Sequence, residues 1–252
     1  MASFTDASHN MLFRLADHPD KWREDLRKSA AGDITGYQEA ESSAARSTLK
    51  SFCERNDRGL YMPADCGNPI SWKNTVFNQM RGEAGVIEVH KKHPTAKYNP
   101  ARDICWVGLR YLSTGKKVLR INIHPVASAT KPDAKSNWGA NLAAWKDWAL
   151  ANYFLDVMAF TAEQMSREYY DAILLGGDYN AYLDRDGRWY YPGALLPALY
   201  QDDQRMRGLD HLQSTHGSDV KEGRRWAVQG NTDHAIHLLN RTFVNVPDYP
   251  RQ

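Results

Sequence analysis

The sequence is dominated by short β-like segments that do not alternate regularly with helices. Clear examples are 84–90 (AGVIEVH), 103–112 (DICWVGLRYL) and 116–127 (KKVLRINIHPVA). The last two are joined by STGK, which is typical of a hairpin turn. Many strands with few helices between them favour packed sheets with helices on the outside.

Further strands and two helices complete the predicted element order. Strands are predicted at 33–40, 68–73, 171–180, 208–215, 224–230 and 233–239. A helix is predicted over 18–33, since Pro19 suits a first turn and Gly32 can end it. A long helix is predicted over 137–160, where Trp145, Ala149 and Tyr153 form an apolar stripe. Thr161 with Gln164 resembles a capping box that opens a separate helical turn.

Composition narrows the class of protein. The 252 residues contain no repeat, low-complexity tract or linker, so we expect one domain over 1–252. The formal net charge is only +2, so any surface that attracts a polyanion must be local. Three basic segments are candidates for such a surface: His90–His93, Arg205 with Arg207, and Lys221–Trp226.

The cysteines and the N-terminal residues predict a cytoplasmic setting. Three cysteines without CxxC spacing are typical of reduced thiols in an intracellular protein. The first residues, MASFTDASHN, lack a signal-peptide pattern, and no apolar run reaches membrane-spanning length. We therefore expect a cytoplasmic protein that does not bind membranes. The sequence indicates no obligate protein partner.

Polar side chains interrupt or end several of the predicted strands. A single carboxylate at a strand end is usually a turn former, but these positions come from five separate segments. They are Glu39, His124, Asp178, Asn180, Asp210, Asp233 and His234. Glu39 and Asp233 are hard oxygen ligands that suit Mg²⁺, and His124 and His234 can transfer protons near neutral pH. The set therefore predicts a catalytic cleft at one rim of the sheets.

Five short motifs in this order resemble those of the endonuclease/exonuclease/phosphatase superfamily. They are GYQE, INIH, GGDYN, GLDHLQ and NTDHAIHLL, and they span nearly the whole chain. The superfamily includes pancreatic-type deoxyribonucleases, abasic-site endonucleases, inositol polyphosphate 5-phosphatases and sphingomyelinases. The resemblance implies an α/β (α+β) fold, a four-layer two-sheet β-sandwich flanked by helices, and a metal-dependent phosphoesterase activity.

The resemblance also implies roles for the site residues. Glu39 and Asn10 would hold Mg²⁺, with Mn²⁺ as a substitute, and Asp233 would lie in a metal shell or beside His234. Asp178 would orient or deprotonate the attacking water, and Asn180 would bind the phosphate. His234, oriented by Asp210, would contact the phosphate or move a proton. His124 would face that pair as a second acid or phosphate ligand. The glycines before Asp178 would let the chain run close to its neighbours.

The substrate stays open at this stage. The leading prediction is a nuclease that cuts DNA or RNA, and the alternative is a phosphatase or phosphodiesterase of small molecules or lipid headgroups. The loop Arg188–Gly193 (RWYYPG) could stack on bases, with Arg188 binding substrate, or could cover the edge of the core. A binding module without activity is less consistent with a complete set of reactive side chains. The spacing of the remaining histidines does not favour structural zinc, because no cysteine pair or HExxH accompanies them.

Overall fold

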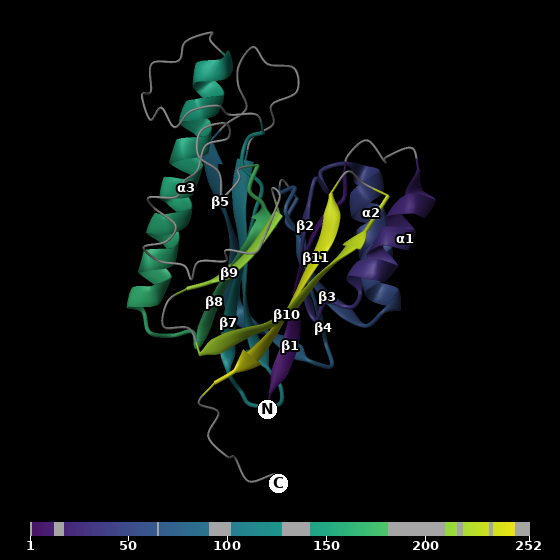
Figure 1. The fold of residues 1–252 in the computed structure, drawn as a ribbon, viewed down its shortest axis with the longest axis vertical. Coiled ribbons are helices and arrows are strands. Elements are labelled where there is room, and N and C mark those ends of the chain that lie inside the picture. The colour runs from purple at the N-terminus through teal and green to yellow at the C-terminus, as the bar shows by residue number, and fades with distance from the viewer. Residues whose placement is uncertain are drawn as a thin grey trace.

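The computed structural model describes residues 2–12, 18–64, 66–90, 102–127, 142–180, 210–215, 219–231 and 234–244. Two β-sheets face each other and helices cover their outer faces, so the molecule has four layers (Figure 1). The predicted sandwich flanked by helices is therefore confirmed.

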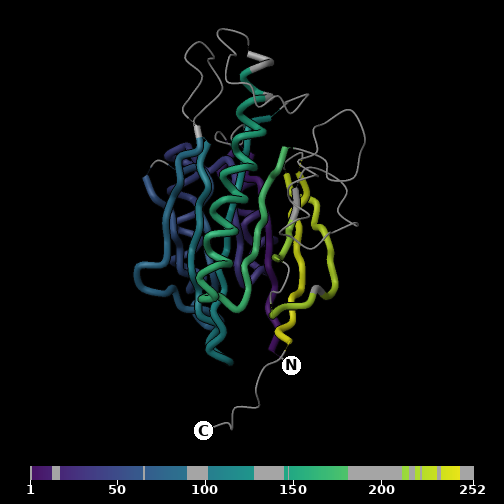
Figure 2. The backbone as a smooth tube through the Cα atoms, turned by 90° about the vertical axis from the view of Figure 1, so that its left-hand side faces the viewer, coloured from purple at the N-terminus to yellow at the C-terminus, as the bar shows by residue number. Residues whose placement is uncertain are grey.

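The six-stranded sheet contains both the first and the last strand of the chain. Its strand order is β10-β11-β1-β2-β4-β3. The strands are β1 (Ser3–Asn10), β2 (Ile34–Gln38), β3 (Arg58–Tyr61), β4 (Ile70–Lys73), β10 (Val220–Gln229) and β11 (Ala235–Phe243). β1 is parallel to β2 and antiparallel to β11, so the C-terminal strands in yellow lie beside the N-terminal strand in purple (Figure 2).

The five-stranded sheet follows chain order. Its strands are β5 (Phe77–His90), β6 (Arg102–Tyr111), β7 (Lys117–Ile123), β8 (Ala172–Asp178) and β9 (Asp210–Ser214). β6 and β7 form the predicted hairpin, and Gly115 in its turn has a φ of 73°. β7 and β8 run parallel, so their carboxyl ends meet at one edge of the sheet.

Helices cover the outer face of each sheet. α1 (Pro19–Ser29) and α2 (Ser43–Arg55) pack on the six-stranded sheet through a buried cluster that includes Trp22, Leu49 and Tyr37. α3 (Leu142–Ser166) packs on the five-stranded sheet. The prediction that a new helical turn starts at Thr161 is wrong. The Thr161 hydroxyl donates to the Val157 carbonyl at 2.7 Å and continues the helix instead of capping one.

Two further observations concern the compartment predictions. Cys53, Cys66 and Cys105 are all buried, and none forms a disulfide. None of the helices in the described part of the chain combines the length and the apolar composition needed to cross a lipid bilayer.

The space between the sheets changes from apolar to polar along the strands. On β7 the residues that face the other sheet are Val118, Arg120 and Asn122, whereas Leu119 and Ile121 pack toward α3. Because strand side chains alternate between faces, every second residue of β7 faces the other sheet. These residues change from apolar Val118 to the polar Arg120 and Asn122. The strand then leads to His124, one of the predicted site residues.

Candidate active site

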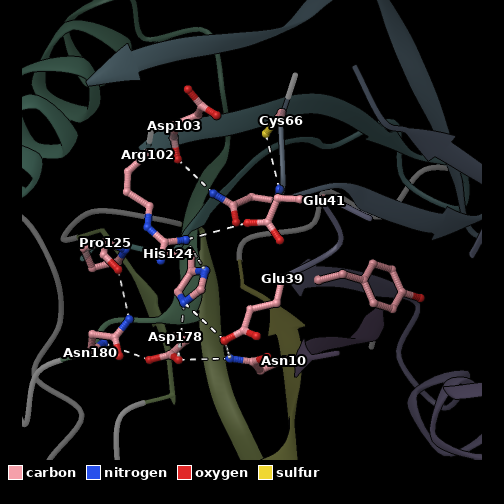
Figure 3. Close-up of polar contacts among 12 residues, drawn as sticks. Asn10, Glu39, Glu41, Cys66, Arg102, Asp103, His124, Pro125, Asp178 and Asn180 are labelled. Atoms are coloured by element: carbon pink, nitrogen blue, oxygen red, sulfur yellow. Dashed lines mark hydrogen bonds and ion pairs between the residues drawn. The ribbon is translucent and has the colours of Figure 1, made fainter. Parts of the chain in front are cut away.

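The site lies where the carboxyl ends of β1, β2, β7 and β8 meet across the two sheets (Figure 3). Asn10 ends β1, Glu39 follows β2, His124 follows β7 and Asp178 ends β8. His234 approaches the same group from just before β11. Parallel pairing within each sheet places these strand ends at one edge, so residues far apart in sequence become neighbours.

Asn10 lies between two carboxylates. Its amide Nδ2 donates to Asp178 Oδ2 at 3.1 Å and to Glu39 Oε1 at 3.3 Å, which links the two sheets. Its Oδ1 accepts the Leu12 backbone N–H at 2.9 Å, which fixes the orientation of the amide. The side chain of Asn10 therefore holds two negative groups close together in a buried setting.

The backbone of Glu39 explains how its carboxylate enters the site. Tyr37 packs outward against α1 and α2, so simple alternation would place Glu39 on the same outer face. Instead Glu39 has a φ of 59°, in the left-handed region that non-glycine residues rarely adopt. This turn brings its Oε1 within 3.9 Å of His124 Nε2.

Asp178 is the most connected carboxylate of the site. It is 1% exposed, and its Oδ1 accepts the Asn180 backbone N–H at 2.8 Å. Its Oδ2 lies 3.7 Å from Nε2 of both His124 and His234. The two imidazoles therefore face the same carboxylate oxygen from different sheets.

The glycines before Asp178 have the role expected from the sequence. A Cβ on Gly177 would lie 2.0 Å from the Ile123 carbonyl oxygen, and its φ is 149°. A Cβ on Gly176 would lie 2.5 Å from an Arg120 guanidinium nitrogen. Both positions require glycine because β8 runs directly against β7 and against a buried arginine.

His124 is buried and held from two sides. Its Nδ1 lies 3.0 Å from Arg102 Nη1, and its backbone N–H donates to the Tyr153 hydroxyl at 3.2 Å. Burial, followed by the positive charges of Arg102 and His234, lowers the pKa of His124 well below its ordinary value.

Asn180 connects the end of β8 to the segment after β7. Its Nδ2 donates to the Pro125 carbonyl at 2.9 Å, and its φ is 50°. One amide hydrogen of Asn180 remains for another acceptor, because a carboxamide nitrogen carries two. Two of the site residues, Glu39 and Asn180, thus have left-handed backbone at a strand end.

The donor set suits a hard divalent cation. Glu39 Oε1 and Asp178 Oδ2 both contact one amide nitrogen, so the site gathers two carboxylates around a neutral side chain. Oxygen ligands of this kind are preferred by Mg²⁺. Within the described ranges, however, no three His, Cys, Asp or Glu side chains are arranged as a ready ligand set. The residues fit a metal bound by few protein ligands.

The structure brings together six of the predicted site residues: Asn10, Glu39, His124, Asp178, Asn180 and His234. Asp233 and Arg188 lie outside the described residues. For Asp210 only the backbone is described, and it pairs with Asp178 across β8 and β9.

Two residues that contact His124, Arg102 and Tyr153, were not predicted from the sequence. The pairing of Ile104 with Ile123 could have indicated Arg102, because it places the start of β6 beside His124.

No protein-family model matches the sequence, and no curated protein is significantly similar to it. Solved structures do share its fold. An endonuclease/exonuclease/phosphatase family protein from Bacteroides thetaiotaomicron matches with a TM-score of 0.65 and 14% identity, over 97% of this chain and 99% of that one. A mannosyl-6-phosphatase from the same species matches with a TM-score of 0.65 and 14% identity, over 95% and 100%. TDP2 from D. rerio, complexed with a single-strand DNA product, matches with a TM-score of 0.61 and 12% identity, over 96% and 100%. The chain therefore has the fold that the motif resemblance implied.

Proposed function

We propose that this chain, which has the endonuclease/exonuclease/phosphatase fold, is a divalent-metal-dependent phosphoesterase that hydrolyses its substrate by attack of water. The observation that carries this proposal is the meeting of Glu39, Asp178 and two histidines at one edge of the sandwich. Carboxylates and imidazoles within about 4 Å of one another are the groups that metal-assisted hydrolysis needs.

The preferred substrate is nucleic acid, with DNA first. The neighbour with a single-strand DNA product supports a polymer substrate, because the same fold there accommodates a DNA strand. The mannosyl-6-phosphatase neighbour supports the alternative, a phosphatase or phosphodiesterase of small molecules or lipid headgroups. Both substrates present a phosphate ester to the same set of side chains.

Each side chain has a role that its contacts allow. Asp178 would hold the attacking water and accept its proton, because both histidines and Asn10 surround its Oδ2. Asn180 would donate its remaining amide hydrogen to a phosphate oxygen. His234 would contact the phosphate or move a proton, and Asp210 would orient it.

Glu39 and Asn10 would hold Mg²⁺ or Mn²⁺, with Asp233 in a metal shell or beside His234. A bound ion would neutralise the charge that builds on the phosphate in the transition state. Arg188 would contact the substrate next to the cleft. The roles of Asp210, Asp233 and Arg188 rest on the motif resemblance.

Cleavage of supercoiled plasmid DNA with Mg²⁺ tests the function. We expect nicking by the wild type that is lost with EDTA and in His234→Ala. His237→Ala is the matched control, since His237 lies on the adjoining strand β11 and pairs with Ser8, away from the contact with Asp178. A folded wild type that does not nick the plasmid with Mg²⁺ or Mn²⁺ would exclude a plain DNA endonuclease, and phosphate release from small phosphoesters would then be measured.

Metal binding is tested separately from activity. Mg²⁺ should raise the melting temperature of the wild type, because a ligand that binds only the native state stabilises it. Glu39→Gln keeps the size of the side chain but removes the charge, so the shift should disappear. An equal shift in both proteins would show that Glu39 does not hold the ion.

A further inference from the structure

Arg102 makes a contact that determines how His124 presents its ring. Arg102 Nη1 lies 3.0 Å from His124 Nδ1, within hydrogen-bonding distance. An arginine has only donors, so His124 Nδ1 must be the acceptor in this contact. The ring hydrogen then lies on Nε2, which faces the carboxylate oxygens of Glu39 and Asp178 at 3.9 and 3.7 Å.

Arg102 is itself held in place from the opposite side. The same Nη1 lies 3.7 Å from Glu41 Oε1, and the Arg102 side chain is only 13% exposed (Figure 3). Glu41 packs against Gly67, where an added Cβ would lie 2.4 Å from its carboxylate. Arg46 pins the chain around Gly67 by donating to the carbonyls of Met62, Pro63 and Cys66. The contact with Glu41, whose own neighbours are held by Arg46, therefore fixes the position of the Arg102 guanidinium.

Tyr153 of α3 connects the backbone of His124 to Asp103, the residue after Arg102 on β6. The Tyr153 hydroxyl accepts the His124 N–H at 3.2 Å and donates to the Asp103 carbonyl at 2.6 Å. Asn68 Nδ2 donates to the same carbonyl at 2.9 Å. The start of β6 therefore holds both the main chain and the ring of His124.

We infer that Arg102 is a positioning residue that fixes His124 in its Nε2–H tautomer, so that His124 presents an N–H donor to the phosphate. This inference rests on the proposed function for the identity of the acceptor. Of the two roles that the sequence left open for His124, it favours the phosphate ligand. A neutral ring whose Nδ1 accepts from a guanidinium carries its hydrogen on Nε2, and a phosphate oxygen can accept it.

The tautomer is measured directly by nitrogen NMR on the full chain labelled in its histidines, without metal and at neutral pH. Nine histidines are present, and the spectrum of His124→Gln identifies the signals of His124. We expect an unprotonated Nδ1 and a protonated Nε2 in the wild type, and the same pattern in Arg102→Lys, which still donates. Protonation of Nδ1 in the wild type would overturn the inference. This readout does not depend on any activity, so it stands even if the proposed function fails.

Kinetics test whether Arg102 acts through His124. Arg102→Met should lower kcat by about 10- to 100-fold with little change in KM, as loss of an outer partner of a functional histidine does. In a His124→Ala background the same change should cost almost nothing further. Arg110→Met is the matched control, because Arg110 lies exposed at the other end of β6, and it should keep full activity. An equal loss from Arg102→Met in both backgrounds would overturn the role.

Discussion

At the scale of single residues, the site concentrates unfavourable features. Glu39 and Asn180 have φ values of 59° and 50°, a conformation that costs non-glycine residues free energy. In addition, the carboxylates of Glu39 and Asp178 both contact the same Asn10 nitrogen, so two like charges lie close together. A fold tolerates strain and like charge at one place only when the surrounding structure is stable enough to impose them.

Asp178→Asn should separate activity from stability. The substitution keeps an oxygen for the Asn180 N–H but removes a buried charge next to Glu39. We expect kcat to fall by about 10²- to 10⁴-fold, the range for loss of a positioned base. The melting temperature should change little, because relief of the repulsion from Glu39 offsets loss of the hydrogen bond that Oδ2 accepts from Asn10.

Asp171→Asn serves as the control for that substitution. Asp171 directly precedes β8 at its opposite end, where it pairs with Lys116 at 2.7 Å. Its loss should leave kcat unchanged. If Asp178→Asn retained wild-type turnover, Asp178 could not be the group that holds the water.

The sequence predicts the site residues that follow apolar strands, because a polar side chain there is visible against its neighbours. Asp178 and His124 belong to this class. Arg102 does not, since an arginine after a loop is usually a solvated surface residue. Its role depends on the β6–β7 register and on Glu41, which come from separate segments. The predicted hairpin places Arg102 near His124, but the contact with Glu41 is set by tertiary packing and leaves no local pattern.

At the scale of elements, the closeness of β7 and β8 depends on glycine. Gly177 leaves room for the Ile123 carbonyl, and Gly176 leaves room for Arg120. The same two strands end in His124 and Asp178, so any separation of β8 from β7 would also separate the reactive groups.

Gly177→Ala should therefore disrupt the sheet. The new Cβ would meet backbone at 2.0 Å, which no side-chain rotation can relieve. We expect a loss of about 3 kcal/mol or more in the free energy of unfolding, measured with urea. Gly115→Ala is the control, since it has a φ of 73° but no atom within 4 Å of the new Cβ, and it should cost only about 1 kcal/mol. Equal losses would show that φ, and not the close approach, requires glycine.

α1 holds Asn231, which lies three residues before His234 in the sequence. The buried carboxylate of Asp25 accepts the Asn231 backbone N–H at 2.8 Å and its Nδ2 at 2.9 Å. Asp25→Ala should speed hydrogen exchange at the Asn231 amide and lower kcat, because the approach of His234 to Asp178 would no longer be anchored. Asp20→Ala, an exposed acid on the same helix, should change neither. Unchanged exchange in Asp25→Ala would contradict the anchoring role.

Some elements were predictable from pattern and others were not. α1 was found because Pro19, Trp22 and Leu26 combine a start signal with one apolar face. α2 was missed, although Ala45, Leu49 and Phe52 share a buried face and Ser42 caps it by accepting the Ala45 N–H. The short β3 was missed because it has four residues, and the only buried one is an arginine, Arg58. Its pairing with β4 gives it order that its own sequence does not.

At the scale of the whole molecule, a buried charge cluster joins the two sheets. Asp6 of β1 accepts from Arg120 Nε of β7 at 2.9 Å and from Arg241 of β11 at 3.3 Å. All three side chains are fully buried. One carboxylate thus pairs with two guanidinium groups, and its charge offsets part of the cost of burying them.

Asp6→Asn should destabilise the molecule strongly. The substitution keeps the shape of the side chain but removes the buried charge that pairs with Arg120 and Arg241, so we expect a loss of about 3–5 kcal/mol on urea unfolding. Glu54→Gln, which removes one partner of the exposed pair with Lys50, should cost less than about 1 kcal/mol. A small effect at Asp6 would mean that this charge cluster is not needed to hold the sheets together.

The pairing of β1 with β11 also sets the order of events during synthesis. Ser3 lies opposite Thr242, so β1 gains β11 as a neighbour only after all the residues between them have been synthesised. Asn10 reaches Asp178 from the end of β1, and His234 reaches it from just before β11. The group of side chains proposed for the reaction is therefore complete only when β11 has docked on β1.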